Sequence, residues 1–66
     1  MFPENYLIDP YHEGYLSAER DHEDGADPAA MLLLADVLRE INADDRDREP
    51  YYIGRVDYCM DVLRGR

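Results

Sequence analysis

The chain has 66 residues, and its 16 acidic side chains outnumber its seven basic ones to give a net charge of −9. A chain this short buries only about 60% of the surface that it exposes when unfolded, which leaves little interior for an enclosed active site. Its single cysteine, Cys59, excludes an internal disulfide and a metal-binding pair of thiols. The fold must therefore rest on helix packing, with self-association as a further source of stability.

The acidic charge is concentrated in the first part of the chain. Residues 1–38 hold nine acids and one base, a net charge of −8, whereas residues 39–66 hold seven acids and six bases, a net charge of −1. Such a charge repels nucleic acid and anionic membranes and favours a basic partner surface. The sequence has no apolar stretch near the roughly 20 residues that cross a bilayer, and no signal-peptide pattern at its start. We therefore expect a cytoplasmic protein without direct contact to nucleic acid or membrane.

Acid–proline pairs predict where the helices begin. These pairs are Asp9-Pro10, Asp27-Pro28 and Glu49-Pro50. An aspartate at the N-cap accepts free backbone N–H groups, and a proline in the first turn lacks a donor that would go unused. Because Glu is a poorer cap, Asp47 is the alternative start of the third helix. The residues suited to ending the helices are Gly25, Asn42 and Gly65.

These signals predict helices over 10–24, 28–42 and 48–64, preceded by an irregular arm over 1–8. Apolar residues recur at helical spacing in each one. They are Tyr11, Tyr15, Ala18 and His22 in the first; Ala30, Leu33, Leu34, Val37, Leu38 and Ile41 in the second; and Tyr52, Val56, Cys59, Met60 and Leu63 in the third. The pattern predicts an all-α, compact three-helix bundle. We place the second helix at its centre, because its apolar stripe is the broadest, and the apolar residues of the arm over one open side.

A short pattern recurs at an interval of 40 residues. Pro10-Tyr11, Gly14 and Asp21 are matched by Pro50-Tyr51, Gly54 and Asp61. Each glycine lies in the second turn of a predicted helix, where it costs about 1 kcal/mol relative to alanine. One interpretation is that each glycine allows another segment to approach closely. The alternative is a chance recurrence that the helices tolerate.

The sequence offers no convincing catalytic or metal-binding group. Glu19 and His22 form a Glu-x-x-His step, but a di-iron site needs matching carboxylates on other helices. Ser17 and Cys59 lie on different predicted helices, and nothing places a histidine beside either. Cys59 is expected in the core, and His22 at the end of the apolar face of its helix. We therefore expect no enzyme, no metal and no cofactor.

The outer half of the first helix is the main candidate for a binding surface. Most acids of this helix project from that half, and Leu16 lies in its middle. Acids three or four residues apart on a helix cost a few tenths of a kcal/mol per pair, so a sequence that keeps several is expected to use them. An apolar anchor surrounded by carboxylates is typical of a binding site for a basic protein. The predicted partner-binding residues are Glu13, Leu16, Glu19, Glu23 and Asp24.

A second candidate patch lies on the third helix. Tyr51, Arg55 and Tyr58 line up on a side away from its main apolar face. Tyrosine and arginine are enriched where proteins meet. The alternative is that this edge packs against the first helix or the arm. Stacking on single-stranded nucleic acid uses similar residues, but the net charge argues against it.

The length, the acidic run from Glu13 to Asp24 and the lack of catalytic groups resemble the small anti-CRISPR and DNA-mimic inhibitors of phages. The likeness is one of kind, because these inhibitors share neither a diagnostic motif nor a common fold. It implies carboxylates that replace DNA phosphates in an arginine-lined groove of a nucleic-acid-binding protein, such as a CRISPR-Cas subunit in a bacterial host cell. Glu13, Glu19, Glu23 and Asp24 would then contact arginines, and Leu16 would fill a neighbouring pocket.

Two other interpretations stay open. Tyr11-His12-Glu13-Gly14-Tyr15 and the later Gly54 resemble the aromatic–glycine repeats of the ribosome modulation factors. That family is basic because it binds ribosomal RNA, so the opposite sign of the charge here weakens the likeness. The other interpretation is a small regulatory or structural adaptor, for example a homodimer through the edge that carries Tyr51 and Tyr58.

Overall fold

Aspartates start the first two helices, as the sequence predicts. The computed structural model describes residues 9–65, in which α1 spans Pro10–Glu23, α2 spans Pro28–Ile41 and α3 spans Arg48–Leu63. The predicted arm over 1–8 lies outside the described residues. Asp9 accepts a hydrogen bond of 2.7 Å from the His12 amide. Asp27 accepts one of 3.2 Å from the Ala29 amide. Each carboxylate thus takes up a donor that the first helical turn leaves free.

The third helix has a different N-terminal capping interaction. Asp47 is at its N-cap, but the Asp47 side chain makes no capping hydrogen bond. Instead, the Asp45 carboxylate accepts from the backbone amides of Arg48 and Asp47, both at 2.9 Å. These two bonds lower the pKa of Asp45, with the bond from Arg48 as the larger cause. Asp45, in the connection between α2 and α3, therefore fixes the start of α3.

Glycines end α1 and α3. Gly25 and Gly65 have φ angles of 107° and 90°, in the left-handed region that residues with a Cβ rarely adopt. Asn42 ends α2 without entering that region, since its φ is −103°. Its side-chain amide donates instead to the Leu38 carbonyl at 2.8 Å. All three predicted helix ends are confirmed to within two residues.

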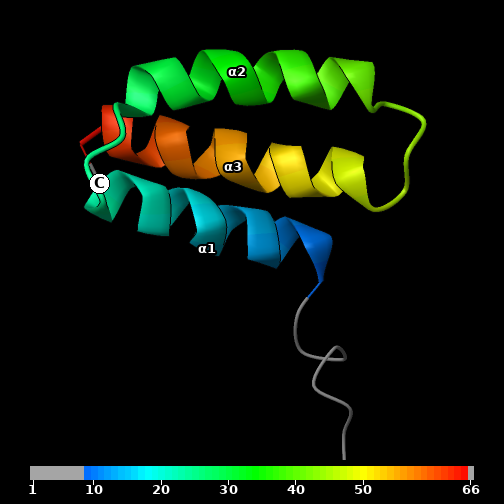
Figure 1. Cartoon of the computed structure of the whole chain (residues 1–66), viewed down its shortest axis with the longest axis horizontal. Helices are drawn as coiled ribbons and strands as arrows, with labels where there is room; N and C mark the ends of the chain where they lie inside the picture. The colour runs from blue at the N-terminus through cyan, green and yellow to red at the C-terminus, as the bar shows by residue number, and fades with distance from the viewer. Residues whose placement is uncertain (1–8, 66) are drawn as a thin grey trace, which may run out of the picture.

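The three helices form the predicted all-α bundle, but α3 and not α2 lies at its centre. Both α1 and α2 pack along α3, one on each side (Figure 1). The prediction that the second helix is central was therefore wrong. The prediction was based on the broad apolar stripe of α2. However, Leu33 and Ile41 of that stripe are 72% and 71% exposed. The number of apolar residues on a helix does not say how many neighbours cover it.

The core is small. Its buried hydrophobic residues are Ala18, Met31, Ala35, Tyr58 and Cys59. Cys59 lies in the core, as the sequence predicts, and is the largest completely buried side chain among the residues that the structure describes. Tyr15, Leu32 and Val62 are partly buried against this cluster. A core in which the fully enclosed positions hold only alanine or cysteine gives the isolated chain little apolar burial.

The closest approach between helices is made at the two glycines of the 40-residue repeat. A Cβ on Gly14 would lie 1.9 Å from the Tyr51 carbonyl oxygen of α3, and one on Gly54 would lie 2.1 Å from the Tyr11 carbonyl oxygen of α1. The two contacts are equivalent under the repeat, since Tyr11 matches Tyr51 and Gly14 matches Gly54. Helices α1 and α3 also run in the same direction (Figure 1). The repeat therefore corresponds to a pairwise helix crossing that requires residues without side chains.

We predict that Gly14→Ala destabilises the protein by about 1–3 kcal/mol, because the added methyl group overlaps the backbone of α3. At an open helical position the same change would stabilise the helix by about 1 kcal/mol. The sign of the change thus separates the two explanations of the repeat. Thermal and urea unfolding of the wild type, Gly14→Ala and Gly54→Ala measure it. An unchanged or higher melting temperature in both variants would show that the helices do not cross at these glycines.

Candidate functional site

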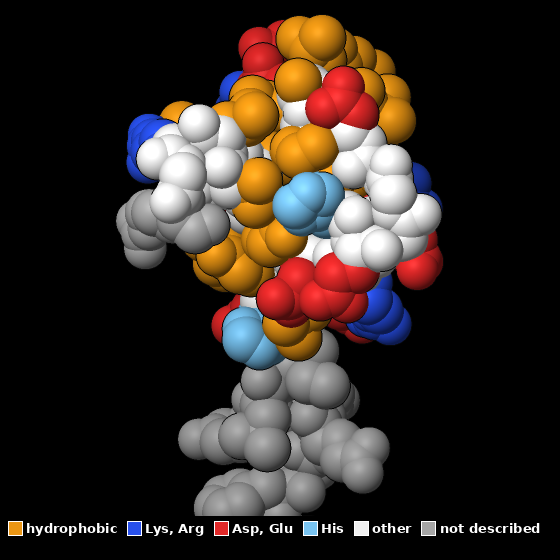
Figure 2. All heavy atoms as spheres, turned by 90° about the vertical axis from the view of Figure 1, so that its left-hand side faces the viewer, with side chains coloured by type: hydrophobic (Ala, Val, Ile, Leu, Met, Phe, Trp, Pro, Cys, Tyr) orange, Lys and Arg blue, Asp and Glu red, His pale blue; other side chains and the backbone are white. Residues whose placement is uncertain are grey.

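Helix α1 turns one half towards α3 and the other half to solvent. Gly14 and Ala18 are buried on the inner half. Leu16, 38% exposed, projects from the middle of the outer half. Of the predicted acidic contacts, Glu13, Glu23 and Asp24 are exposed and Glu19 is partly exposed. Figure 2 looks onto the end of the molecule where α1 finishes. It shows one cluster of acidic side chains low on the molecule, on the side of α1, and further acidic side chains nearer the top. The five predicted residues thus share one surface, here termed the acidic face.

Polar contacts join the inner half of α1 to α3, and they follow the repeat. Tyr11 donates a hydrogen bond to Asp57, and Tyr15 donates one of 2.8 Å to Asp61. In the opposite direction, Tyr51 of α3 donates to Ser17 of α1 at 3.0 Å. Each tyrosine at the start of one helix therefore reaches the other helix at the equivalent position. These pairs fix the rotation of α1 about its own axis and so keep its acidic face outward.

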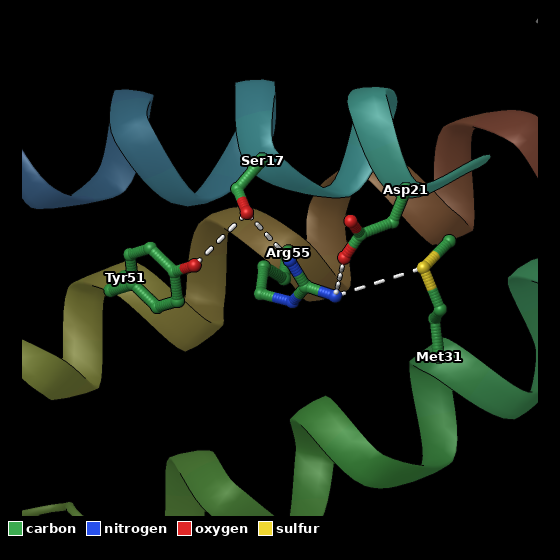
Figure 3. Close-up of polar contacts among 5 residues, drawn as sticks. All are labelled: Ser17, Asp21, Met31, Tyr51 and Arg55. Atoms are coloured by element: carbon green, nitrogen blue, oxygen red, sulfur yellow. Dashed lines mark hydrogen bonds and ion pairs between the residues drawn. The ribbon is translucent and has the colours of Figure 1, made fainter. Parts of the chain in front are cut away.

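Arg55 of α3 makes further polar contacts across the same interface (Figure 3). Its guanidinium donates to Ser17 Oγ and to Asp21 Oδ2, both at 2.9 Å, and lies 3.7 Å from the Met31 sulfur. The side chain is only 15% exposed, whereas Asp21 is 49% exposed. Burial lowers the pKa of Arg55, but the hydrogen bond to Asp21 and the nearby Tyr51 outweigh it, so the pKa is raised. One arginine therefore links all three helices.

The predicted second patch proves to be the α1–α3 interface. Tyr51 is hydrogen-bonded to Ser17, Arg55 is hydrogen-bonded to Asp21, and Tyr58 is only 9% exposed. Of the two interpretations of this edge, the structure supports packing against the first helix. The physical reason is the crossing at the glycines, which brings this side of α3 against α1. The edge is accordingly not open for a homodimer.

Tyr58 and His22 form the buried end of this interface. A hydrogen bond of 2.8 Å joins the Tyr58 hydroxyl to His22 Nδ1, and the two rings meet edge to face at 5.9 Å. Tyr15 packs edge to face on Tyr58 from the other side, at 5.3 Å. Burial, followed by the negative charges of Glu19 and Glu23, raises the pKa of Tyr58. His22 thus closes the apolar face of α1, as predicted, with its polar edge on a tyrosine hydroxyl.

Some of the carboxylates within residues 9–65 make hydrogen bonds or ion pairs with other described residues. The engaged ones are Asp9, Asp21, Asp27, Asp36, Asp45, Asp57 and Asp61. In contrast, no hydrogen bond or ion pair within residues 9–65 involves the carboxylates of Glu13, Glu19, Glu23 or Asp24. These four carboxylates of the acidic face therefore remain available to a ligand.

Other kinds of site are not evident in the described part of the chain. Burial raises the pKa of Cys59, which disfavours the reactive thiolate. Residues 9–65 contain no group of three or more histidine, cysteine or acidic side chains positioned to hold a metal ion. None of the three helices has the length and apolar character that crossing a membrane requires. Comparison of the chain with protein-family models, curated proteins and solved structures finds no match.

Arg55→Met should destabilise the protein by about 1.5–3 kcal/mol, the range for losing hydrogen bonds that involve a charged group. Arg48→Met is the matched control, because the Arg48 side chain is 70% exposed and its ion pair with Asp45 is long, at 3.9 Å. The control should change the free energy of unfolding by no more than about 0.5 kcal/mol. Urea titrations measure both. Equal losses in the two variants would mean that Arg55 does not hold the helices together.

The hydroxyl group of Tyr11 should ionise at an unusually high pH. Its hydrogen bond to Asp57 is the main cause that raises its pKa to about 12. The absorbance of phenolate at 295 nm, taken as wild type minus Tyr11→Phe, should therefore rise with a midpoint near pH 12. An unfolded tyrosine ionises near pH 10, so the stability that Tyr11 contributes is complete below pH 10 and is lost as the pH rises towards 12. A difference curve centred at pH 10 would contradict the Tyr11–Asp57 bond.

Proposed function

We propose that this chain is an inhibitor that binds a basic, nucleic-acid-binding surface through the acidic face of α1. The observation that carries the proposal is that the carboxylates of Glu13, Glu19, Glu23 and Asp24 share the outer half of α1 and make no hydrogen bond or ion pair within residues 9–65. A protein of net charge −9 is steered towards positive surfaces. Leu16, in the middle of the face, adds an apolar contact that excludes water from the surrounding charge pairs.

The dimensions of the acidic face are compatible with mimicry of a DNA strand. From Glu13 to Asp24 the helix rises by about 16 Å, at 1.5 Å per residue. One strand of DNA places about five phosphates along that length, at 3.4 Å per phosphate. The four free carboxylates would therefore meet arginines arranged for a phosphate backbone. We propose that the chain occupies such a groove and prevents recruitment of the nucleic acid, as a phage anti-CRISPR protein acting on a CRISPR-Cas subunit would.

A small regulatory or structural adaptor is the second candidate. The observation that favours it is the set of large aliphatic side chains that α2 leaves exposed. Apolar patches of this kind mark contact sites between proteins. Under this alternative the acidic face serves solubility, and binding to a basic partner would not depend on it.

Charge reversal tests the proposal. Glu19→Lys combined with Glu23→Lys should weaken binding to the basic partner by about 100-fold or more, because truncating one side of a close charge pair already costs about 2–5 kcal/mol. Partners are captured from bacterial lysate on the immobilised wild type and eluted with a salt gradient. The affinity of each purified partner, CRISPR-Cas effector complexes included, is then measured together with its ability to bind DNA in the presence of the chain.

Asp44→Lys combined with Asp47→Lys is the matched control. It changes the net charge by the same amount at two exposed residues between α2 and α3, and neither of these carboxylates makes a hydrogen bond or ion pair within residues 9–65. The control should retain binding and competition with DNA. If both doubly reversed variants bind alike, the partner responds to net charge and not to the acidic face. If the α1 variant binds as the wild type does, the acidic face is not the binding site.

A further inference from the structure

One face of α2 is apolar and exposed. Leu33, Leu34, Val37 and Ile41 are 72%, 61%, 54% and 71% exposed, respectively. At 100° per residue these four side chains fall within about 100° of the helix circumference. Met31 and Ala35, which are buried, lie on the other side of α2. We term the four exposed residues the aliphatic stripe.

The stripe points away from the rest of the molecule. Helix α2 packs along α3, while α1 lies on the opposite side of α3 (Figure 1). In Figure 2, hydrophobic side chains crowd the top of the molecule, where α2 runs. A soluble monomer rarely leaves a continuous row of large aliphatic residues in water.

A second copy of the chain is the occupant that the energetics favour. Within residues 9–65, the core of one copy contains few large side chains, and Cys59 is the largest of these residues that is completely buried. Chains of this size that cannot bury enough apolar surface alone commonly gain stability by oligomerisation. A second copy of the chain would cover the aliphatic stripe without the need for a different protein.

The charge distribution also allows two copies to meet at α2. The net charge of −9 opposes self-association in general. However, the acidic face lies on α1, across α3 from the stripe (Figure 1). Beside the stripe, Asp36 is paired with Arg39 at 2.6 Å. Glu40 is exposed at the edge of the stripe. Contact through α2 nevertheless leaves the two acidic faces at opposite ends of the pair.

We propose that the chain forms a two-fold symmetric homodimer in which the aliphatic stripe of α2 packs against the same stripe of a second copy. Leu33 and Ile41 lie four residues before and after Val37, so these two residues of the stripe are evenly arranged about it. A two-fold axis through Val37 brings this residue against its own copy, as an isologous interface requires. A standard interface takes about 800 Å² from each partner, a modest share of the 4935 Å² accessible surface of this chain.

Mass measurement tests the dimer directly. Sedimentation equilibrium of the wild type from about 1 to 200 µM, where micromolar association is detected, should give twice the chain mass of 7.7 kDa at the upper end. Leu33→Asp should stay at the single mass with its helical circular dichroism retained. Leu63→Asp is the matched control, since Leu63 is 52% exposed at the end of α3, and should still form the dimer. A single mass for the wild type throughout, or a dimer of Leu33→Asp, would overturn the proposal.

Cross-linking covers the case in which Leu33→Asp does not fold. Val37→Cys under mild oxidation should give a disulfide-linked dimer in high yield, because residues on the two-fold axis approach within disulfide range. Leu63→Cys should give little. Equal yields from the two variants, or none from Val37→Cys, would show that α2 does not meet α2.

This inference does not rest on the proposed function, and the two fail in different experiments. Rising salt should release a basic partner from the acidic face but should leave the dimer intact, because its contact is apolar. The Glu19→Lys and Glu23→Lys changes should likewise leave the mass unchanged. A dimer that dissociates in high salt would mean that charge and not the aliphatic stripe holds the copies together.

Discussion

The crossing of α1 and α3 at two glycines is the constraint on which the rest of the structure depends. At Gly14 and Gly54 each helix touches the backbone of the other, with no space for even a methyl group. This contact selects the inner half of α1 and thereby turns its outer half, with Leu16 at the middle, to solvent. It also makes α3 the central helix. The aromatic–glycine repeat thus has a structural explanation in this chain.

The polar contacts of the interface divide the carboxylates into two groups. Tyrosines and one arginine bind aspartates along the α1–α3 interface, including Asp21, Asp57 and Asp61. The glutamates of the outer half of α1 take no part in that network. Some carboxylates of this protein therefore hold the helices together, and others are free to contact a ligand. The net charge alone does not distinguish these two groups. The proposed function rests on the second group.

The helices and their ends could be predicted from the sequence because they depend on local chemistry. Asp9 and Asp27 cap helices, and Gly25 and Gly65 end them, through contacts within a few residues. The outward position of the acidic face followed from helical periodicity in the same way. What α1 packs against could not be predicted in this way, because it is decided by residues far apart in the chain.

Three features escaped prediction for that reason. The central position of α3 and the role of Arg55 both depend on the crossing at the glycines, for which the 40-residue repeat was the only signal. Taken as a contact, the repeat selects the alternative in which the edge with Tyr51 and Arg55 packs against the first helix. The exposure of Leu33 and Ile41 was missed because periodicity shows that a face is apolar and not whether it is covered.

The crossing itself is best tested by proton NMR of the uniformly labelled protein. The account predicts strong nuclear Overhauser effects between the α protons of Gly14 and Tyr51, and between an α proton of Gly54 and the amide proton of Tyr15, because the backbones touch there. If these effects are absent and Gly14 instead shows contacts to α2, the inner half of α1 does not lie on α3, and the outward acidic face is not a consequence of the fold.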